Sequence, residues 1–507
     1  MQLCACAANP VVEVDGELLQ GDRDRGEIAV FRGVPFAEPP VGDLRWQRPQ
    51  PLQTKSAVRD ATKFRAACMQ SMRILNWYRD LAETFGASRN VFDDLAISED
   101  CLYLNVWTPD FRPAARLPVM VFIHGGSNNS GWAYEPNYHG NALAGRGVVV
   151  VSIAYRLGVF GFFSHPETSD ANFGLWDQLA ALEWVQRHIA TFGGDPARVT
   201  VFGESAGAQD VLALMASPRA SGLFHRAILQ STAGFGIGPK SQPTLDEEQR
   251  RGVLTADLFG FVGAESLEQL RQVPAARLLR VYEDNFAEHY HTPAIDNSLL
   301  SEPVWHSINA GRIAAIPIII GTNADEWYES APADADSDDV IDRVSASRYL
   351  NAPSVVEAVL AETDPREALD RIDSAEFMLC PSQRLAAMQT ARYGNAWVYY
   401  FSRVRDGAAG SSVRAYHGAE LPYVFGSHDP WLPTTDVDWL LTRQIMGYWT
   451  SFAGNGDPNA TGSPPWATFS DPAGPVMTFA NEVRQGAAQE PVLCAVFRQA
   501  MERAGEN

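Results

Sequence analysis

The stretch VTVFGESAGA, from Val199 to Ala208, places a serine between two glycines directly after a run of β-forming residues. Gly203, Ser205 and Gly207 match the pattern G-x-S-x-G, which predicts a sharp turn from a strand into a helix. Glycine is needed on both sides because larger neighbours would clash around the strained serine backbone. The alternative is a tight turn with an idle serine. The strand before and the predicted helix after favour a displayed nucleophile.

Short apolar runs elsewhere in the chain predict a sheet of buried strands. These runs cover residues 118–123, 148–153, 199–202, 226–229, 316–320 and 397–401. Helical patterns fall between them, the clearest ending at Gly193 and Gly194. This alternation predicts an α/β fold with a mostly parallel sheet covered on both faces. Residues 240–304 and 328–392 are expected to form mostly helical insertions over the carboxyl edge of the sheet, where such sheets bind ligands.

Composition and charge exclude several classes of partner. The 507 residues carry a formal net charge of -21, which disfavours nucleic acid and anionic membranes as partners. No apolar run approaches the ~18–20 residues that span a bilayer. The first residues show no intact signal peptide, so the location is cytoplasmic by default, or secreted or periplasmic if such a peptide was removed. None of the six cysteines has zinc-site spacing, and no metal site is expected.

A serine nucleophile requires a base and an acid, which follow it along the chain in this type of fold. His417 stands in the right order, in a loop after the predicted strand 397–401, and has small neighbours. The other histidines downstream of Ser205 fit less well: His225, His289, His291, His306 and His428. Asp325 and Glu326 both follow the strand 316–320, and the spacing does not choose between them.

A second glycine-rich loop provides candidate donors for an oxyanion. In VFIHGGSNNSG, which begins at Val121, a predicted strand leads into Gly125, Gly126 and Ser127. Backbone N–H groups there can approach a substrate oxygen, and each good donor is worth ~3–4 kcal/mol in the transition state. The alternative is an ordinary glycine-rich turn. A phosphate loop is unsupported because no G-x-x-x-x-G-K-[ST] pattern is present.

Ordered blocks over residues 14–497 resemble the type-B carboxylesterase family of α/β-hydrolases, which includes bacterial carboxylesterases and the cholinesterases. The blocks include FRGVPFAEPPVGDLRW at Phe31, SEDCLYLNVWTP at Ser98, YRLGVFGF at Tyr155, GTNADE at Gly321 and HGAELPYVFG at His417. The resemblance implies one α/β-hydrolase catalytic domain over residues 1–507, in which residues 1–13 form a frayed N-terminal segment. It also implies that no cofactor is needed.

The resemblance assigns catalytic roles residue by residue. It implies that Ser205 is the nucleophile, that His417 is the base and that Glu326, rather than Asp325, is the acid. The oxyanion donors map to the backbone amides of Gly126, Ser127 and Ala206. The family often has Gly or Ala where Ser127 stands, and that change leaves the backbone N–H in place.

Other positions acquire expected roles from the same resemblance. Glu204 maps to a buried glutamate of the site's hydrogen-bond network, and Ser231 maps to a serine that supports the acid. Cys68 and Cys101 map to a disulfide that closes a flap, in which Trp77 is expected to line the site entrance.

The chain also departs from the family pattern. Asp210 stands where a serine is usual, Asn297 where a glycine is usual, and Trp327 follows the acid where a glycine is usual. We expect Trp327 to reshape the pocket.

The sequence therefore predicts a hydrolase that cleaves small-molecule carboxylic esters through an acyl-enzyme intermediate with a Ser-His-Glu triad. Hydrolysis of amides or carbamates by the same groups is one alternative. A non-catalytic, adhesion-type binding protein on the same fold is another, although members of that type usually lack part of the triad. Substrate preference and oligomeric state are left open.

Overall fold

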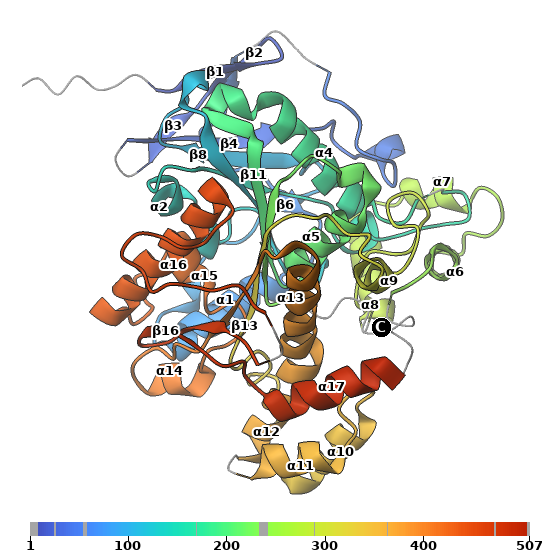
Figure 1. Cartoon of the computed structure of the whole chain (residues 1–507). Helices are drawn as coiled ribbons and strands as arrows, with labels where there is room; N and C mark the ends of the chain where they lie inside the picture. The colour runs from blue at the N-terminus through green and yellow to red at the C-terminus, as the bar shows by residue number, and fades with distance from the viewer. Residues whose placement is uncertain are drawn as a thin grey trace, which may run out of the picture.

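The computed structural model describes residues 9–24, 27–53, 58–168, 170–232, 242–287, 289–361, 364–470 and 473–503. Within these residues an eleven-stranded mixed sheet forms the centre of the molecule (Figure 1). Its strands lie in the order β16 (Val483–Gly486), β15 (Val476–Phe479), β14 (Ala396–Phe401), β13 (Ile318–Asn323), β12 (Arg226–Gln230), β11 (Gly194–Glu204), β9 (Leu117–Ile123), β10 (Val149–Ile153), β8 (Tyr103–Thr108), β4 (Ile28–Pro35) and β3 (Asp22–Asp24). The seven strands from β15 to β10 pair in parallel, whereas both edges are antiparallel. The predicted α/β fold class is confirmed.

Each face of the sheet packs into its own hydrophobic core. Side chains alternate along β9, so that Val119 and Val121 face one core while Met120 and Phe122 face the other. Helices α4 (Phe173–His188) and α5 (Ala206–Ala216) pack into the first core, and α15 (Leu421–Phe425) and α16 (Asp436–Asn455) into the second. Figure 1 shows α16 and α5 on opposite sides of β11. Burial on both faces explains why these strands read as nearly continuous apolar runs.

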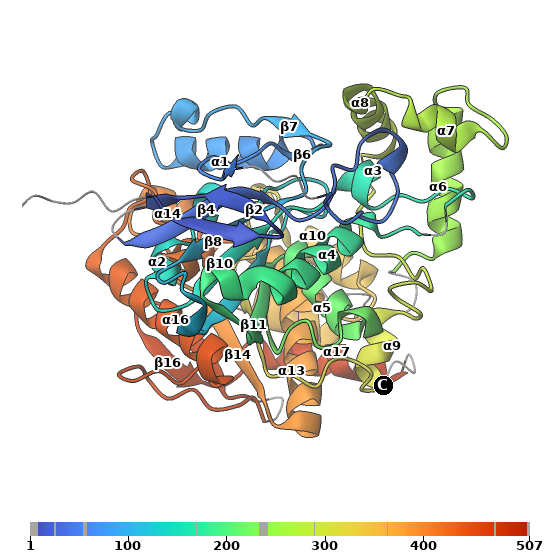
Figure 2. The same ribbon diagram turned by 90° about the horizontal axis from the view of Figure 1, so that it is seen from above.

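The two predicted insertions are largely helical. The first holds α6 (Leu245–Asp257), α7 (Ser266–Arg271), α8 (Ala275–Phe286) and the start of α9 (Val304–Asn309). The second holds α10 (Ser337–Ala346), α11 (Pro353–Leu360), α12 (Pro365–Ser374), a π-helical turn (Ala375–Leu379) and α13 (Cys380–Tyr393). Figure 2 shows α6, α7 and α8 grouped at one side of the molecule. Shorter helices are α2 (Asn141–Ala144), α3 (Gly158–Gly161) and α14 (Ala408–Val413).

The N-terminal segment differs from the expectation of a frayed stretch over residues 1–13. Val11–Val14 form strand β1, which pairs antiparallel with β2 (Glu17–Gln20), and β5 (Val58–Asp60) joins β2 in a small sheet. Asp15 and Gly16 connect the first two strands with φ of 49° and 80°. An Asp-Gly pair with positive φ at both residues is a strong hairpin signal, and it fixes this segment. Residues 1–8 lie outside the described part of the chain.

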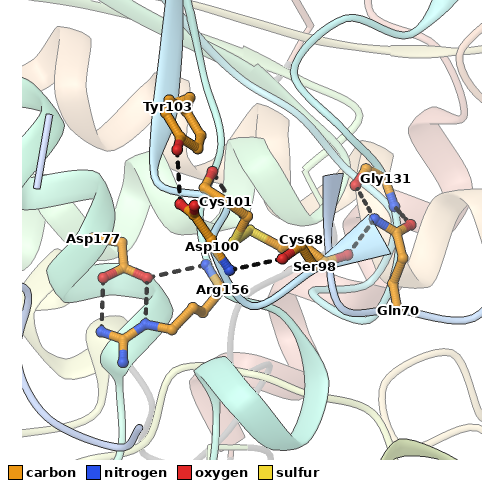
Figure 3. Close-up of a disulfide and its surroundings, with 9 residues drawn as sticks. All are labelled: Cys68, Gln70, Ser98, Asp100, Cys101, Tyr103, Gly131, Arg156 and Asp177. Atoms are coloured by element: carbon orange, nitrogen blue, oxygen red, sulfur yellow. Dashed lines mark hydrogen bonds and ion pairs between the residues drawn. A yellow bond between two sulfur atoms is a disulfide. The ribbon is translucent and has the colours of Figure 1, made fainter. Parts of the chain in front are cut away.

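Two disulfides cross-link the chain. Cys68 and Cys101 form the bridge that the resemblance implies, and the closed segment carries helix α1 (Arg73–Thr84) (Figure 3). Cys68 lies in β6 (Ala67–Cys68), which pairs with β7 (Ile97–Ser98). A second bridge, between Cys380 at the start of α13 and Cys494 in α17 (Pro491–Arg503), was not predicted from the sequence. No described helix is long and apolar enough to cross a bilayer.

Candidate active site

Ser205 lies at the turn between β11 and α5, with φ of 56° and ψ of -126°. This backbone conformation is costly for a residue with a side chain, so its surroundings must hold it. Its N–H donates to the carbonyl of Gln230 on the neighbouring strand at 2.9 Å. A Cβ on Gly203 would come within 2.5 Å of Gly207, and a Cβ on Gly207 would collide with the carbonyl of Ile123. The two glycines of the pattern therefore permit the close packing that fixes the turn.

His417 and Glu326 meet beside this turn. His417 Nδ1 lies 2.6 Å from Glu326 Oε2, and Glu326 Oε1 accepts a hydrogen bond from the Asn323 backbone N–H at 2.6 Å. Asp325 instead accepts hydrogen bonds from the Arg414 guanidinium at 3.0 Å and the Ala415 backbone N–H at 3.1 Å. The two neighbouring carboxylates thus point to different partners, and Glu326 is the one that holds the imidazole.

Glu204 approaches the other side of the same imidazole. Its Oε1 lies 3.2 Å from His417 Nε2. Burial lowers the pKa of His417, but the nearby Glu204 and Glu326 carboxylates outweigh this effect and raise it to about 10. Burial in turn raises the pKa of Glu204 to about 8. The imidazole is thus surrounded by groups that stabilise its protonated form.

Residues 125–131 form the loop that is expected to supply oxyanion donors, and we call it the oxyanion loop. Its residues Gly125, Gly126 and Ser127 line the same cavity as Ser205. Gly126 has a φ of 101°, and the non-glycine residues Ser127 and Asn128 have φ of 60° and 55°. The Gly126 carbonyl accepts the backbone N–H groups of Asn129 and Ser130, both at 3.1 Å. At the end of the loop, Gly131 exchanges two hydrogen bonds of 2.7 Å with the amide of Gln70 (Figure 3). Ala206, the third expected donor, is buried at the start of α5.

Asn128 connects the oxyanion loop to the helix that follows Ser205. Its Nδ2 donates to Asp210 Oδ1 at 3.1 Å, and Tyr155 donates to its Oδ1 at 3.1 Å. Gln178 donates to the second oxygen of Asp210 at 2.6 Å. Asn128, Asp210 and Gln178 are fully buried, and burial raises the pKa of Asp210 to about 7. The departure at Asp210 therefore forms part of a hydrogen-bonded link between the two halves of the site.

The supports of the acid differ from those that the resemblance implies. Ser231 Oγ is buried and has no hydrogen-bond partner within the described residues, so it does not hold Glu326 in this structure. Glu420 lies behind the acid instead, where it accepts hydrogen bonds from Asn323 Nδ2 at 2.7 Å and Gln230 Nε2 at 2.9 Å. Sequence reasoning missed Glu420. Its position three residues after His417, within the block HGAELPYVFG, was the available signal.

A cavity of about 300 Å³ contains Ser205, His417 and Glu326. Trp77 from the flap and Trp327 from the acid loop both line it. The Trp327 ring lies nearly parallel to the His417 ring, at 10° and 6.3 Å between centroids, and Trp77 Nε1 donates to Glu329 at 3.2 Å. Among the described residues, no group of three or more His, Cys, Asp or Glu is placed to hold a metal ion.

A family model and several known proteins match nearly the whole chain. A family model described as the carboxylesterase family matches residues 8–494. A para-nitrobenzyl esterase of Bacillus subtilis (strain 168) is 34% identical over 485 residues, which cover 92% of this chain and 94% of that protein. A fumonisin B1 esterase of Sphingopyxis macrogoltabida is 32% identical over 495 residues, covering 91% and 85%.

Solved esterase structures also match nearly the whole chain. A PNB esterase has a TM-score of 0.81 at 30% identity, covering 97% of this chain and 99% of that chain. A carboxylesterase of Geobacillus stearothermophilus has a TM-score of 0.80 at 29% identity, covering 96% and 99%.

Proposed function

Because this chain belongs to the carboxylesterase family and is a carboxylic ester hydrolase with the α/β-hydrolase fold, we propose that it works through a Ser205–His417–Glu326 triad and an acyl-enzyme. The observation that carries this proposal is the Glu326–His417 contact of 2.6 Å in a cavity that also contains Ser205. Glu326 holds the Nδ1 side of the ring, which leaves Nε2 as the proton acceptor.

The proposed reaction has two halves. In the first, His417 takes the proton of Ser205 as its oxygen attacks the ester carbonyl, and the backbone N–H groups of Gly126, Ser127 and Ala206 stabilise the oxyanion. His417 then gives its proton to the leaving alcohol, and an acyl ester remains on Ser205. In the second half, His417 takes a proton from a water molecule as its oxygen attacks the acyl group, and it then returns this proton to the Ser205 oxygen as the carboxylic acid leaves. Glu326 stabilises the imidazolium formed in both halves.

Glu204 is expected to favour this imidazolium as well. With its carboxylate 3.2 Å from His417 Nε2, the resting imidazole is biased toward its protonated form. Only the neutral form of His417 can accept the proton of Ser205, so the rate of ester hydrolysis should depend on pH.

The triad is tested with a chromogenic short-chain ester and an organophosphate probe that labels activated serines. Ser205→Ala is expected to lower kcat by about four orders of magnitude or more and to abolish labelling. Ser330→Ala, which changes another serine at the same cavity, is the matched control and should retain most of the activity. Full turnover by Ser205→Ala would remove Ser205 from the mechanism. Absence of both turnover and labelling in the unmodified protein would contradict the proposed chemistry.

A further inference from the structure

One cationic side chain other than His417 lines the cavity among the described residues, namely Arg73. It is the first residue of α1, in the flap closed by Cys68 and Cys101. Its Nη2 donates to the carbonyl oxygen of Gly126 at 3.0 Å. The chain as a whole carries a net charge of -21, so the positive charge of Arg73 in this cavity is opposite in sign to the charge of the whole protein.

Most of the hydrogen-bonding capacity of Arg73 is unused within the described part of the chain. A guanidinium has five N–H donors, and one contact, to Gly126, is recorded for it there. No described carboxylate forms an ion pair with it. Burial lowers the pKa of Arg73, and the nearby Tyr290 and Glu135 offset this effect only in part. The side chain is nevertheless accessible, which allows a ligand to reach it.

The carboxylates of the same cavity are directed at other partners. Glu326 contacts His417, and Glu329 accepts a hydrogen bond from Trp77. The two oxygens of Glu135 accept hydrogen bonds from the Trp132 N–H and the Tyr78 hydroxyl, both at 2.9 Å.

Burial also disfavours the ionised form of several of these groups. It raises the pKa of Glu135 to about 7, and it raises the pKa of Glu329. The cavity is therefore less negative near neutral pH than its residue types suggest, and Arg73 keeps an available positive charge.

We propose that the preferred esters carry a carboxylate group, which Arg73 binds at the oxyanion end of the cavity. This inference deepens the proposed ester hydrolysis at Ser205 and rests on it. A planar guanidinium matches a carboxylate with two parallel hydrogen bonds, so Arg73 can select such a substrate while it remains attached to Gly126.

The geometry also limits how far the carboxylate lies from the reacting carbonyl. One residue spans at most about 3.6 Å, so Arg73 Nη2 lies within roughly 7 Å of the Gly126 N–H that is proposed to bind the oxyanion. A spacer of about two to four carbon atoms bridges that separation. Esters of short dicarboxylic acids with one free carboxylate have this size, as do short esters of carboxylated phenols.

The experiment compares esters matched in shape and different in charge. For the acyl side, mono-para-nitrophenyl glutarate is paired with a para-nitrophenyl ester in which an isopropyl group replaces the free carboxylate. For the alcohol side, para-carboxyphenyl acetate is paired with para-isopropylphenyl acetate. Each ester is assayed with the full-length protein and with Arg73→Gln, Arg73→Lys and Arg89→Gln.

Arg73→Gln replaces the guanidinium with a shorter neutral amide, which still carries N–H donors but has no charge. We expect it to lower kcat/KM for one carboxylate-bearing ester by about tenfold to a hundredfold, mainly through KM, and to change the neutral partner less than about threefold. Arg73→Lys should restore part of the preference because the charge returns without the planar donor pair. Arg89→Gln removes a partly exposed arginine from the same flap, outside the cavity lining, and should leave the preference unchanged.

The outcomes separate this inference from the proposed chemistry. The pair that responds to Arg73→Gln identifies whether the carboxylate lies on the acyl or the alcohol side. An equal loss for charged and neutral esters would overturn the inference, because Arg73 would then act only through the oxyanion loop. Hydrolysis of neutral esters with no turnover of either charged ester would also overturn it. Failure of the unmodified protein on all four esters would count against the Ser205 mechanism itself.

Discussion

The turn at Ser205 and the oxyanion loop both contain non-glycine residues with positive φ, but different forces hold them. At Ser205 the surroundings are backbone: a hydrogen bond to Gln230 and the close approach of Gly207 to the strand that ends at Ile123. At Ser127 and Asn128, buried side chains, chiefly Asp210, act beside backbone hydrogen bonds, one of which the Asn128 carbonyl accepts from the Gly158 N–H at 2.7 Å. A backbone contact is fixed by the pairing of the strands, so a single substitution rarely removes it. A side-chain contact is lost when that one side chain is replaced.

This difference teaches where the site can vary. The turn at Ser205 tolerates almost no added atoms at its two glycines, because their neighbours are main-chain groups that cannot move aside. The oxyanion loop is equally crowded by backbone at Gly126 and Gly131, but its buried polar side chains require only partners that satisfy them. Asp210, at a position where the family usually has serine, is one such solution.

The strongest test of the backbone side is Gly207→Ala. The new methyl group would press on the carbonyl oxygens of Ile123 and His124, and we expect the free energy of unfolding to fall by about 3 kcal/mol. We also expect ester turnover to fall by at least about a hundredfold, because the Ala206 N–H moves with the turn. Urea unfolding and kcat measure the two effects. Gly486→Ala, at a glycine with open space around it, is the control. A stable and fully active Gly207→Ala protein would contradict the description of this turn.

The side-chain region is tested by Asp210→Ala. The substitution leaves the buried amides of Asn128 and Gln178 without their acceptor, which costs about 1–3 kcal/mol for each group. We expect kcat to fall about tenfold to a hundredfold with little change in KM, because the Ser127 N–H shifts relative to the oxyanion.

A reversible trifluoromethyl ketone, which mimics the tetrahedral intermediate, should lose affinity for Asp210→Ala in proportion to kcat/KM. Asp210→Asn keeps an acceptor for Asn128 and should recover part of the rate. If Asp210→Ala lowers stability but leaves kcat and the affinity for the ketone unchanged, the link to the oxyanion loop is structural only.

The pH dependence of ester hydrolysis tests a side chain at the turn itself, namely Glu204, which directly precedes Ser205. His417 must be neutral to accept a proton, and its raised pKa places the acid limb of the kcat/KM profile above the ordinary histidine value of 6.5. Glu204→Gln removes the carboxylate beside Nε2, so the pKa of His417 should fall and the acid limb should move to lower pH. Glu183→Gln, on the exposed side of α4, should leave the profile in place. An unchanged acid limb in Glu204→Gln would show that Glu204 does not set it.

The free energy of unfolding should also depend on pH, and it should fall as the pH rises. The folded state binds the His417 proton more tightly than the unfolded chain does, so this stabilisation is complete below pH 6.5 and is lost as the pH rises toward about 10. The raised pKa of Glu204 acts in the same direction, between 4.5 and about 8. Unfolding of Glu204→Gln should therefore depend less on pH over this range.

The smallest expected effect is that of Ser127→Gly. The backbone N–H is kept, so kcat should change by less than about threefold. Relief of the left-handed conformation offsets the greater chain entropy of glycine, and the free energy of unfolding should change by less than about 1 kcal/mol. Ser127→Val is the matched contrast, because a β-branched residue resists positive φ and should lower both values. Equal behaviour of the two variants would mean that the φ of this residue is unimportant.

Local patterns predicted the framework of the molecule well. The six apolar runs became β9 to β14, because a strand buried on both faces needs apolar residues at nearly every position. The turn at Ser205 was recognisable because its glycines report a backbone requirement directly. His417 followed from chain order, while the choice of Glu326 over Asp325 needed the family resemblance.

Contacts between distant segments were beyond this reasoning. Asn128 and Asp210 are 82 residues apart and meet only after β9 and β11 pair. Cys380 and Cys494, with a separation of 114, carry no spacing signal that would pair them. The support of the acid was also misassigned to Ser231, because the hydrogen-bond partner of a buried hydroxyl depends on side-chain geometry that no motif encodes.

The bridge between Cys380 and Cys494 has a consequence for the covalent connectivity of the protein. It closes a ring of chain that contains His417, just as the bridge between Cys68 and Cys101 closes a ring that contains Arg73. A single peptide bond cut inside either ring leaves one covalent molecule, whose pieces separate only after the disulfide is reduced. A nick beside His417 or within the flap would therefore be invisible on a denaturing gel run without a thiol.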